Sequence, residues 1–198
     1  MSDLQRKMLR LLLKHLDELN KIIKELDDDI DNYMKPDQKA ASKSIQDLPG
    51  IGNTSAQAII SVIGTDMQRF PSDAHLSSWA GLCPGNNESA KKRKSGKTRK
   101  GNALLRETLV VCAHSAVKNK NSYFYAQFMR ISAHRGKKRA YVAVAHSMLI
   151  AIYHILKENI CFKDLGADYY NQFNKERKIN AYLRRLKLLG WEGSAVAI

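Results

Sequence analysis

The chain has 198 residues and a formal net charge of +14, which is enough length for one sizeable hydrophobic core. Between residues 81 and 145, 15 lysines and arginines stand against two acidic residues, so nearly all of the surplus charge lies in one third of the chain and favours a nucleic-acid partner. No apolar run reaches the roughly 20 residues of a membrane-spanning helix, and three widely spaced cysteines argue against a zinc site or a disulfide framework.

Residues 1–36 are predicted to form one long helix that serves as a coiled-coil arm. Proline at position 36 disfavours helical backbone at Lys35, so the helix should end there. A helix with one apolar seam needs an apolar partner, so we expect a homo-oligomer formed through the arm, or an arm that docks elsewhere on its own chain. The seam residues recur at alternating steps of three and four: Leu9, Leu12, Leu16, Leu19, Ile23, Leu26, Ile30 and Tyr33.

After a predicted polar linker at 37–44, residues 45–64 read IQDLPGIGNTSAQAIISVIG and look like a helix-hairpin-helix motif. Gly50 and Gly52 allow a tight hairpin around Ile51, with backbone N–H groups at the start of the second helix pointing outward together. Such a cluster of N–H groups receives a DNA phosphate without reading bases. The alternative is a tight connector between two packed helices.

The remaining chain, up to residue 198, is predicted to be a compact helical domain, and the fold class is all-α. Helices are expected to begin near Ser72, Ala103 and Tyr123, with a long apolar helix at 140–156 and a polar one from Asp168. No strand pattern of alternating polarity occurs.

Between the first two of these helices lies a loop with seven lysines and arginines in the ten residues from Lys91 to Lys100. Like charges at this density repel one another, so the loop requires a strongly anionic partner or stays disordered. A second basic cluster precedes the long apolar helix. The residues predicted to contact nucleic acid, besides the hairpin, are Lys91, Lys92, Arg93, Lys94, Lys97, Arg99, Lys100, Arg106, Lys137, Lys138 and Arg139.

Two sequence blocks make the chain resemble a known family. Residues 80–84 read AGLCP and residues 100–106 read KGNALLR, and both stand at family spacing behind the Pro-Gly-Ile-Gly hairpin. Together they resemble the C-terminal half of transposases of the insertion sequence 110/116/902 family. The likeness covers most of the chain, and it is weak in residues 1–44 and after about Cys161.

The resemblance implies a DNA transposase or recombinase whose C-terminal domain, here 37–198, supplies a serine that attacks DNA. It also implies a structured guide RNA, and an acidic RuvC-like domain that holds Mg²⁺. No such acidic domain precedes the arm in this sequence, so the chain is expected to be a cut-down form, a truncated gene or half of a split system. We therefore expect no cofactor in this chain and no DNA cleavage by the chain alone.

Family spacing, eight residues after Gly81, identifies Ser89 as the nucleophile. The family commonly has glycine next, whereas this chain has Ala90 there and a Ser-Gly pair at Ser95, which makes Ser95 the second candidate. A serine hydroxyl needs activation, and nearby lysines and arginines would stabilise the negative charge that develops on the phosphoryl oxygens.

Two alternatives stay open at this point. A non-catalytic nucleic-acid-binding module would use the hairpin and the basic loop only, and a transposon remnant would have no function. The binding module does not explain the AGLCP block with a serine at family spacing. The charged N-terminus is unlike a signal peptide, so we expect a cytoplasmic, nucleoid-associated protein without membrane contact.

Overall fold

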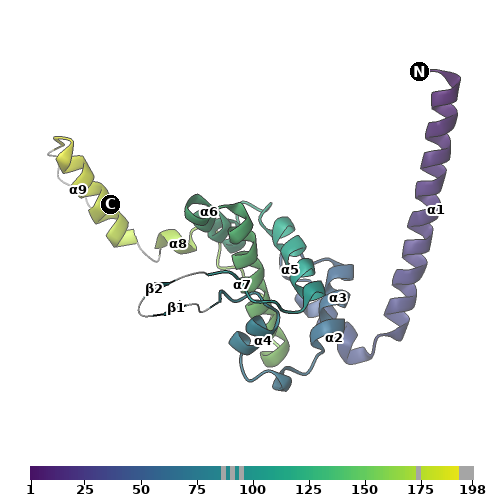
Figure 1. Cartoon of the computed structure of the whole chain (residues 1–198), viewed down its shortest axis with the longest axis horizontal. Helices are drawn as coiled ribbons and strands as arrows, with labels where there is room; N and C mark the ends of the chain where they lie inside the picture. Colours follow the sequence, from purple (N-terminus) through teal and green to yellow (C-terminus); the bar gives the residue numbers. More distant parts are fainter. Residues whose placement is uncertain (86–87, 90–91, 94–95, 173–174, 192–198) are drawn as a thin grey trace.

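The computed structural model describes residues 1–85, 88–89, 92–93, 96–172 and 175–191. It confirms the predicted all-α fold (Figure 1). It also contains two strands of two residues each, which were not predicted from the sequence. The helices are α1 Asp3–Tyr33, α2 Pro36–Ile45, α3 Asn53–Ile63, the 3-10 helix η1 Met67–Arg69, α4 Asp73–Trp79, α5 Ala103–Ala116, α6 Tyr123–Arg135, α7 Lys137–Glu158, α8 Tyr169–Gln172 and α9 Lys175–Leu188; the strands are β1 Glu88–Ser89 and β2 Lys92–Arg93.

Helix α7 is the centre of the core and contacts α2, η1, α4, α5 and α6. It is long and apolar enough to cross a membrane by length and composition, contrary to the expectation that no such segment exists. Its apolar side chains have another role here, because they pack against the surrounding helices. The buried residues of α7 are Ala140, Val144, Ala145, Met148, Leu149, Ile152, Tyr153 and Ile155.

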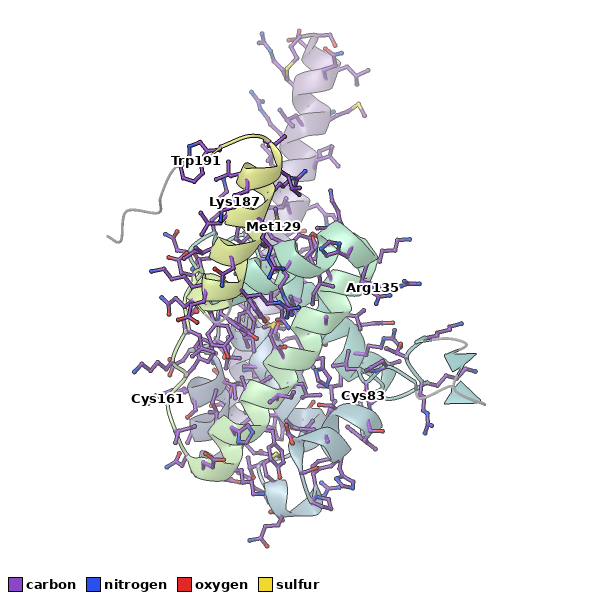
Figure 2. All side chains as sticks on the ribbon, turned by 90° about the vertical axis from the view of Figure 1, so that its left-hand side faces the viewer. Cys83, Met129, Arg135, Cys161, Lys187 and Trp191 are labelled. Atoms are coloured by element: carbon purple, nitrogen blue, oxygen red, sulfur yellow. The ribbon has the colours of Figure 1, made fainter. Side chains whose placement is uncertain are left out.

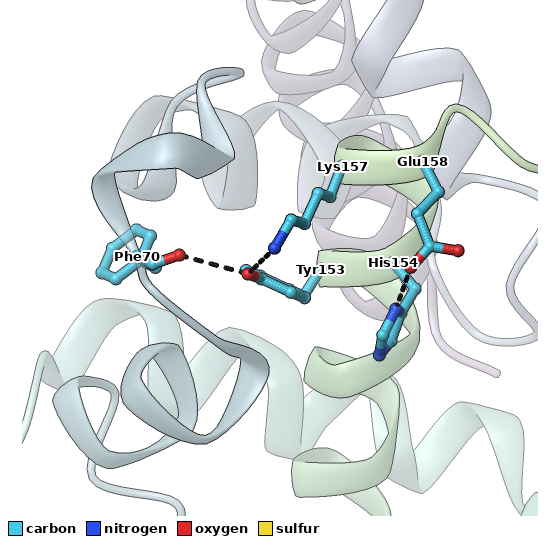
Figure 3. A network of polar contacts seen from close by, with 5 residues as sticks. All are labelled: Phe70, Tyr153, His154, Lys157 and Glu158. Carbon is cyan, nitrogen blue, oxygen red and sulfur yellow. Dashed lines mark hydrogen bonds and ion pairs between the residues drawn. The ribbon is translucent and has the colours of Figure 1, made fainter.

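A polar network fixes the end of α7 to the connection between η1 and α4 (Figure 3). The buried Tyr153 hydroxyl donates to the Phe70 carbonyl oxygen at 3.1 Å and accepts from Lys157 Nζ at 2.9 Å. One helical turn apart, His154 Nδ1 and Glu158 Oε1 form a hydrogen bond of 2.7 Å. The network holds α4, which leads into the basic loop, against the core helix.

Helix α1 extends away from the helical body and has no buried residue (Figure 1). The apolar residues of the predicted seam are all exposed to solvent. Near the C-terminal end of α1, Asp31 Oδ1 accepts a hydrogen bond from Gln57 Nε2 of α3 at 2.6 Å. The predicted long helix is confirmed in extent. Helix α9 likewise projects from the body at its opposite side, with Ile179 and Tyr182 exposed.

Several predicted boundaries were wrong. The expected linker at 37–44 is helix α2, because Pro36 occupies the first helical turn and Gln38 Oε1 accepts from Lys35 N at 3.0 Å in a capping arrangement. The basic cluster at 137–139 is the first turn of α7 rather than a segment before it. The helix expected from Asp168 onward is two helices, α8 and α9.

Candidate nucleic-acid interface

The basic loop leaves the helical body through a closed stem. Gly81, at φ +71°, lies so close to Gly101 that a Cβ on Gly81 would come within 2.8 Å of Gly101 N. Farther out, Gly85 N donates to the Lys97 carbonyl oxygen at 3.1 Å, and Pro84 pairs with Thr98. Beyond them, β1 and β2 pair antiparallel, so the two arms of the loop form one hairpin.

The stem is attached firmly at both ends. On the α4 side, Leu82 N donates to the Ser77 carbonyl oxygen at 3.0 Å, and the Leu82 side chain is buried. On the α5 side, Asn102 Oδ1 accepts from Leu105 N at 2.9 Å and caps the helix, while Leu105 is buried. The AGLCP and KGNALLR blocks are therefore the two sides of a single stem.

Between the stem and helices α6 and α7 lies an open cleft of about 980 Å³. Figure 2 shows Cys83 and Arg135 on the side of the body from which the hairpin projects. The cleft joins parts of the two basic clusters that are far apart in sequence. Its described lining is Leu82, Pro84, Gly96, Lys97, Thr98, Gln127, Arg135, Lys138, Arg139, Val142, Ala143 and His146.

Four cations and no carboxylate line this cleft among the residues that the structure describes: Lys97, Arg135, Lys138 and Arg139. The last three are exposed, and Gly136, at φ +81°, makes the tight turn that brings the end of α6 to the start of α7. The cations in the first turn of α7 are repelled by the partial positive charge at the N-terminal end of this helix. A bound anion would relieve this repulsion, so the cleft is an electropositive site suited to phosphate.

A thiol and an imidazole are in contact beside the cleft, where His146 belongs to the lining. Cys83 Sγ lies 3.7 Å from His146 Nε2. Burial lowers the pKa of His146 below its ordinary value of 6.5, with Asp73 opposing, and burial followed by Asp73 raises the pKa of the Cys83 thiol. Both groups are therefore neutral at pH 7, and their contact ties the stem to α7 without adding charge.

Comparison with known proteins identifies the segment that carries this stem. Residues 42–129 match the model of the transposase IS116/IS110/IS902 family. Residues 42–129 therefore form a transposase domain of this family. No curated protein matches the chain. The match indicates a transposase or recombinase role, which implies DNA as the partner, and its span includes both candidate serines and the whole basic loop.

Within the transposase domain, the structure distributes the predicted loop residues unevenly. Ser89 lies on β1 and pairs with Lys92 on β2, where Arg93 pairs with Glu88. Lys97 lines the cleft, Arg99 and Lys100 are exposed on the stem, and Arg106 is partly exposed in the first turn of α5. Three of the predicted residues lie outside the described part of the chain: Lys91, Lys94 and Ser95.

The second basic cluster contributes Lys138 and Arg139 to the cleft, whereas Lys137 is exposed outside it. Sequence reasoning placed Arg135 in the second basic cluster but did not predict it, Gln127 or His146 as part of the site. A periodic signal existed for His146, because residues 139, 142, 143 and 146 recur at helical spacing and so share one face of α7. Gln127 had no such signal, since it reaches the cleft through the packing of α6 on α7.

The predicted hairpin at Gly50 connects α2 and α3, and much of it faces inward. A Cβ on Gly50 would lie 2.6 Å from Ala116 N of α5, and Ile51 is buried with its N–H donated to the Leu48 carbonyl oxygen at 3.2 Å. Gly52 is exposed and caps α3. Any phosphate contact there falls on Gly52 and the first turn of α3. That turn lies near the C-terminal end of α5, whereas the stem lies at the N-terminal end of α5. The two ends of this helix are on the order of 15–20 Å apart.

Proposed function

We propose that the chain is the serine-bearing, DNA-binding half of a transposase, which cleaves and rejoins strands through a covalent serine–DNA bond. The match of residues 42–129 to the transposase family carries this proposal. We divide the chain into an arm at 1–36 and the transposase domain at 37–198, which acts in the cytoplasm at the nucleoid. The electropositive cleft, the basic hairpin and the exposed start of α3 form its DNA-binding surface.

Binding to DNA is driven by charge. Lys97, Arg135 and Arg139 meet around the cleft, and the hairpin adds the loop cations to this field. Each phosphate that such a surface neutralises releases counterions. A plot of the logarithm of the binding constant against the logarithm of the salt concentration therefore has a slope of about −0.9 per neutralised phosphate. These contacts position the duplex without reading its sequence.

The chemistry belongs to Ser89 in this proposal, with Ser95 as the alternative. The serine hydroxyl gives up its proton as its oxygen attacks phosphorus and forms an O–P bond. The bond from phosphorus to the departing sugar oxygen breaks, and a proton returns to that oxygen, so that no net proton is gained or lost. Lysines and arginines of the hairpin stabilise the charge on the phosphoryl oxygens. The reverse reaction rejoins a strand without a nucleotide cofactor, because the serine ester keeps the energy of the phosphodiester.

Activation of the serine requires partners beyond this chain. Among the described residues, no group of three or more His, Cys, Asp or Glu side chains is placed to hold a metal ion. We assign Mg²⁺ to an acidic RuvC-like domain and the choice of target to a structured guide RNA, because the family resemblance implies both. Alone, the chain binds DNA and neither cleaves nor joins it.

Salt titrations of duplex binding test the DNA-binding part of the proposal. Replacing Lys91, Lys92, Arg93 and Lys94 with alanine should flatten the salt slope by several units. A charge-matched control replaces Arg10, Lys14, Lys21 and Lys24, which lie on the exposed α1, and should leave the slope nearly unchanged. Equal slopes for the loop variant and the parent would show that the basic loop is not the contact.

Denaturing gels test the serine. With the acidic domain and guide RNA supplied, the parent and Ser95→Ala should form a covalent adduct with labelled DNA. Ser89→Ala should form none and should bind DNA nearly as tightly as the parent, since one neutral hydroxyl adds little to a contact made by many charges. An adduct lost only with Ser95→Ala would move the nucleophile to Ser95, and an adduct that survives both changes would refute a serine mechanism.

A further inference from the structure

The cleft beside the hairpin stem has the size of a small-ligand site. Cavities of about 300–1,000 Å³ hold ligands of drug size, and this one measures about 980 Å³. A mononucleotide belongs to that size class, whereas a double helix can only lie across the opening. A base that stays paired within a duplex therefore does not reach the floor of the cleft.

The lining combines an aliphatic floor with a cationic rim. Pro84 and Val142 supply apolar surface above the buried Leu82, while Arg135 and Arg139 supply charge at the exposed edge. A simple phosphate site would need only the cations. The aliphatic floor instead suits the flat apolar face of a base, and apolar side chains are among those that enclose bases taken out of the stack.

A buried amide in the wall lacks one of its hydrogen bonds. Gln127 lines the cleft and is only 8% exposed, and its Nε2 donates to Ser147 Oγ at 2.8 Å. Its Oε1 accepts no hydrogen bond within the described part of the chain. A buried acceptor without a donor costs about 1–3 kcal/mol, so such groups call for an explanation. This oxygen is buried in the cleft wall, so a ligand in the cleft reaches it once the Gln127 side chain turns outward, and every DNA base carries an N–H group that could then supply the missing donor.

We propose that the cleft receives one unpaired nucleotide of bound DNA. Its base lies against Pro84 and Val142 and donates an N–H to Gln127 Oε1, whose side chain turns toward the cleft to accept it. Its phosphate lies at the rim formed by Arg135, Lys138 and Arg139. Because every base offers an N–H donor, the site selects for an unpaired base rather than for its identity. The inference rests on the proposed function, since it requires that the chain bind DNA.

Two duplexes that differ by one unpaired nucleotide test this assignment. One is fully paired, and the other carries a single bulged 2-aminopurine. The full chain should bind the bulged duplex at least several-fold more tightly, and bound protein should protect the bulged base from quenching by acrylamide. Gln127→Leu should lose about three- to tenfold of the affinity for the bulged duplex, the equivalent of one hydrogen bond, and should bind the paired duplex as the parent does.

A second variant keeps the test independent of the amide. Ala143→Phe places a ring in the cleft without removing any cation and should abolish the preference for the bulge, while unchanged thermal unfolding confirms that the variant is folded. Equal binding of both duplexes by the parent, or a bulged base that acrylamide quenches equally in free and bound DNA, would overturn the site and leave the DNA-binding function standing. Failure to bind either duplex at low salt would instead refute the proposed function.

Discussion

Replacing Gly101 with alanine should destabilise the whole domain, because this glycine allows two backbones to meet at the base of the hairpin. A Cβ at Gly101 would lie 2.6 Å from the Ala80 carbonyl oxygen, whereas ordinary contact begins at 3.4 Å. The obstacle is backbone, which cannot turn aside as a side chain would. The stem must then shift by close to 1 Å, and it is joined directly to the buried Ala80 and Leu105.

Overpacking of this kind costs about 1–3 kcal/mol, and we expect the upper end here because backbone is opposed to backbone. For a chain of this length, about 3 kcal/mol lowers the Tm by about 6–12 °C. Thermal and urea unfolding followed by circular dichroism measure both quantities. Gly96→Ala is the matched control, because a Cβ there meets no atom of the described residues within 4 Å, and it should change stability by less than about 0.5 kcal/mol. Equal unfolding of the two variants would refute the close approach of the stem.

Two further predictions concern His146 and the arm. Burial lowers the pKa of His146 in the folded state, so the unfolded chain binds more protons as pH falls below the ordinary value of 6.5. The free energy of unfolding should therefore decrease from pH 7.5 to pH 5.5, and His146→Gln should decrease less in urea titrations; an identical pH dependence would show that the imidazole is not buried. The exposed seam of α1 predicts self-association, so light scattering should report a smaller species for Leu19→Asp with Ile23→Asp than for the parent, and a monomeric parent would mean that the arm does not pair with a second copy.

Local patterns of the sequence were sufficient for most of the helices. The 3.5-residue period gave the extent of α1, and Ser72 caps α4 as its position in the sequence suggested. The cap of α5 by Asn102 was not predicted. Pro36 misled the prediction because a proline can begin a helix as well as end one. Its role at the start of α2 depends on the pairing of Lys35 with Gln38, which is local but was not recognised.

The candidate site was harder to predict because it is made by tertiary contacts. Gly81 and Gly101 are visible as glycines in the sequence, but the sequence does not show that the two backbones touch. Gln127 belongs to α6, and only its packing against α7 brings it to the wall of the cleft beside His146. The charge of the loop was evident from composition, whereas the joining of Lys97 to Arg135 required the fold.

The closed stem also makes the basic loop a separable cassette. The hydrogen bond from Gly85 N to the Lys97 carbonyl oxygen brings the two ends of the intervening segment together, whatever residues lie between them. Lengthening such a segment costs little, since doubling a loop adds only about 0.6 kcal/mol of closure entropy. Segments of different length and charge could therefore be exchanged between residues 85 and 97 while α4, α5 and the walls of the cleft keep their places. Contacts to new DNA or RNA partners could then be changed by grafting one short stretch of sequence.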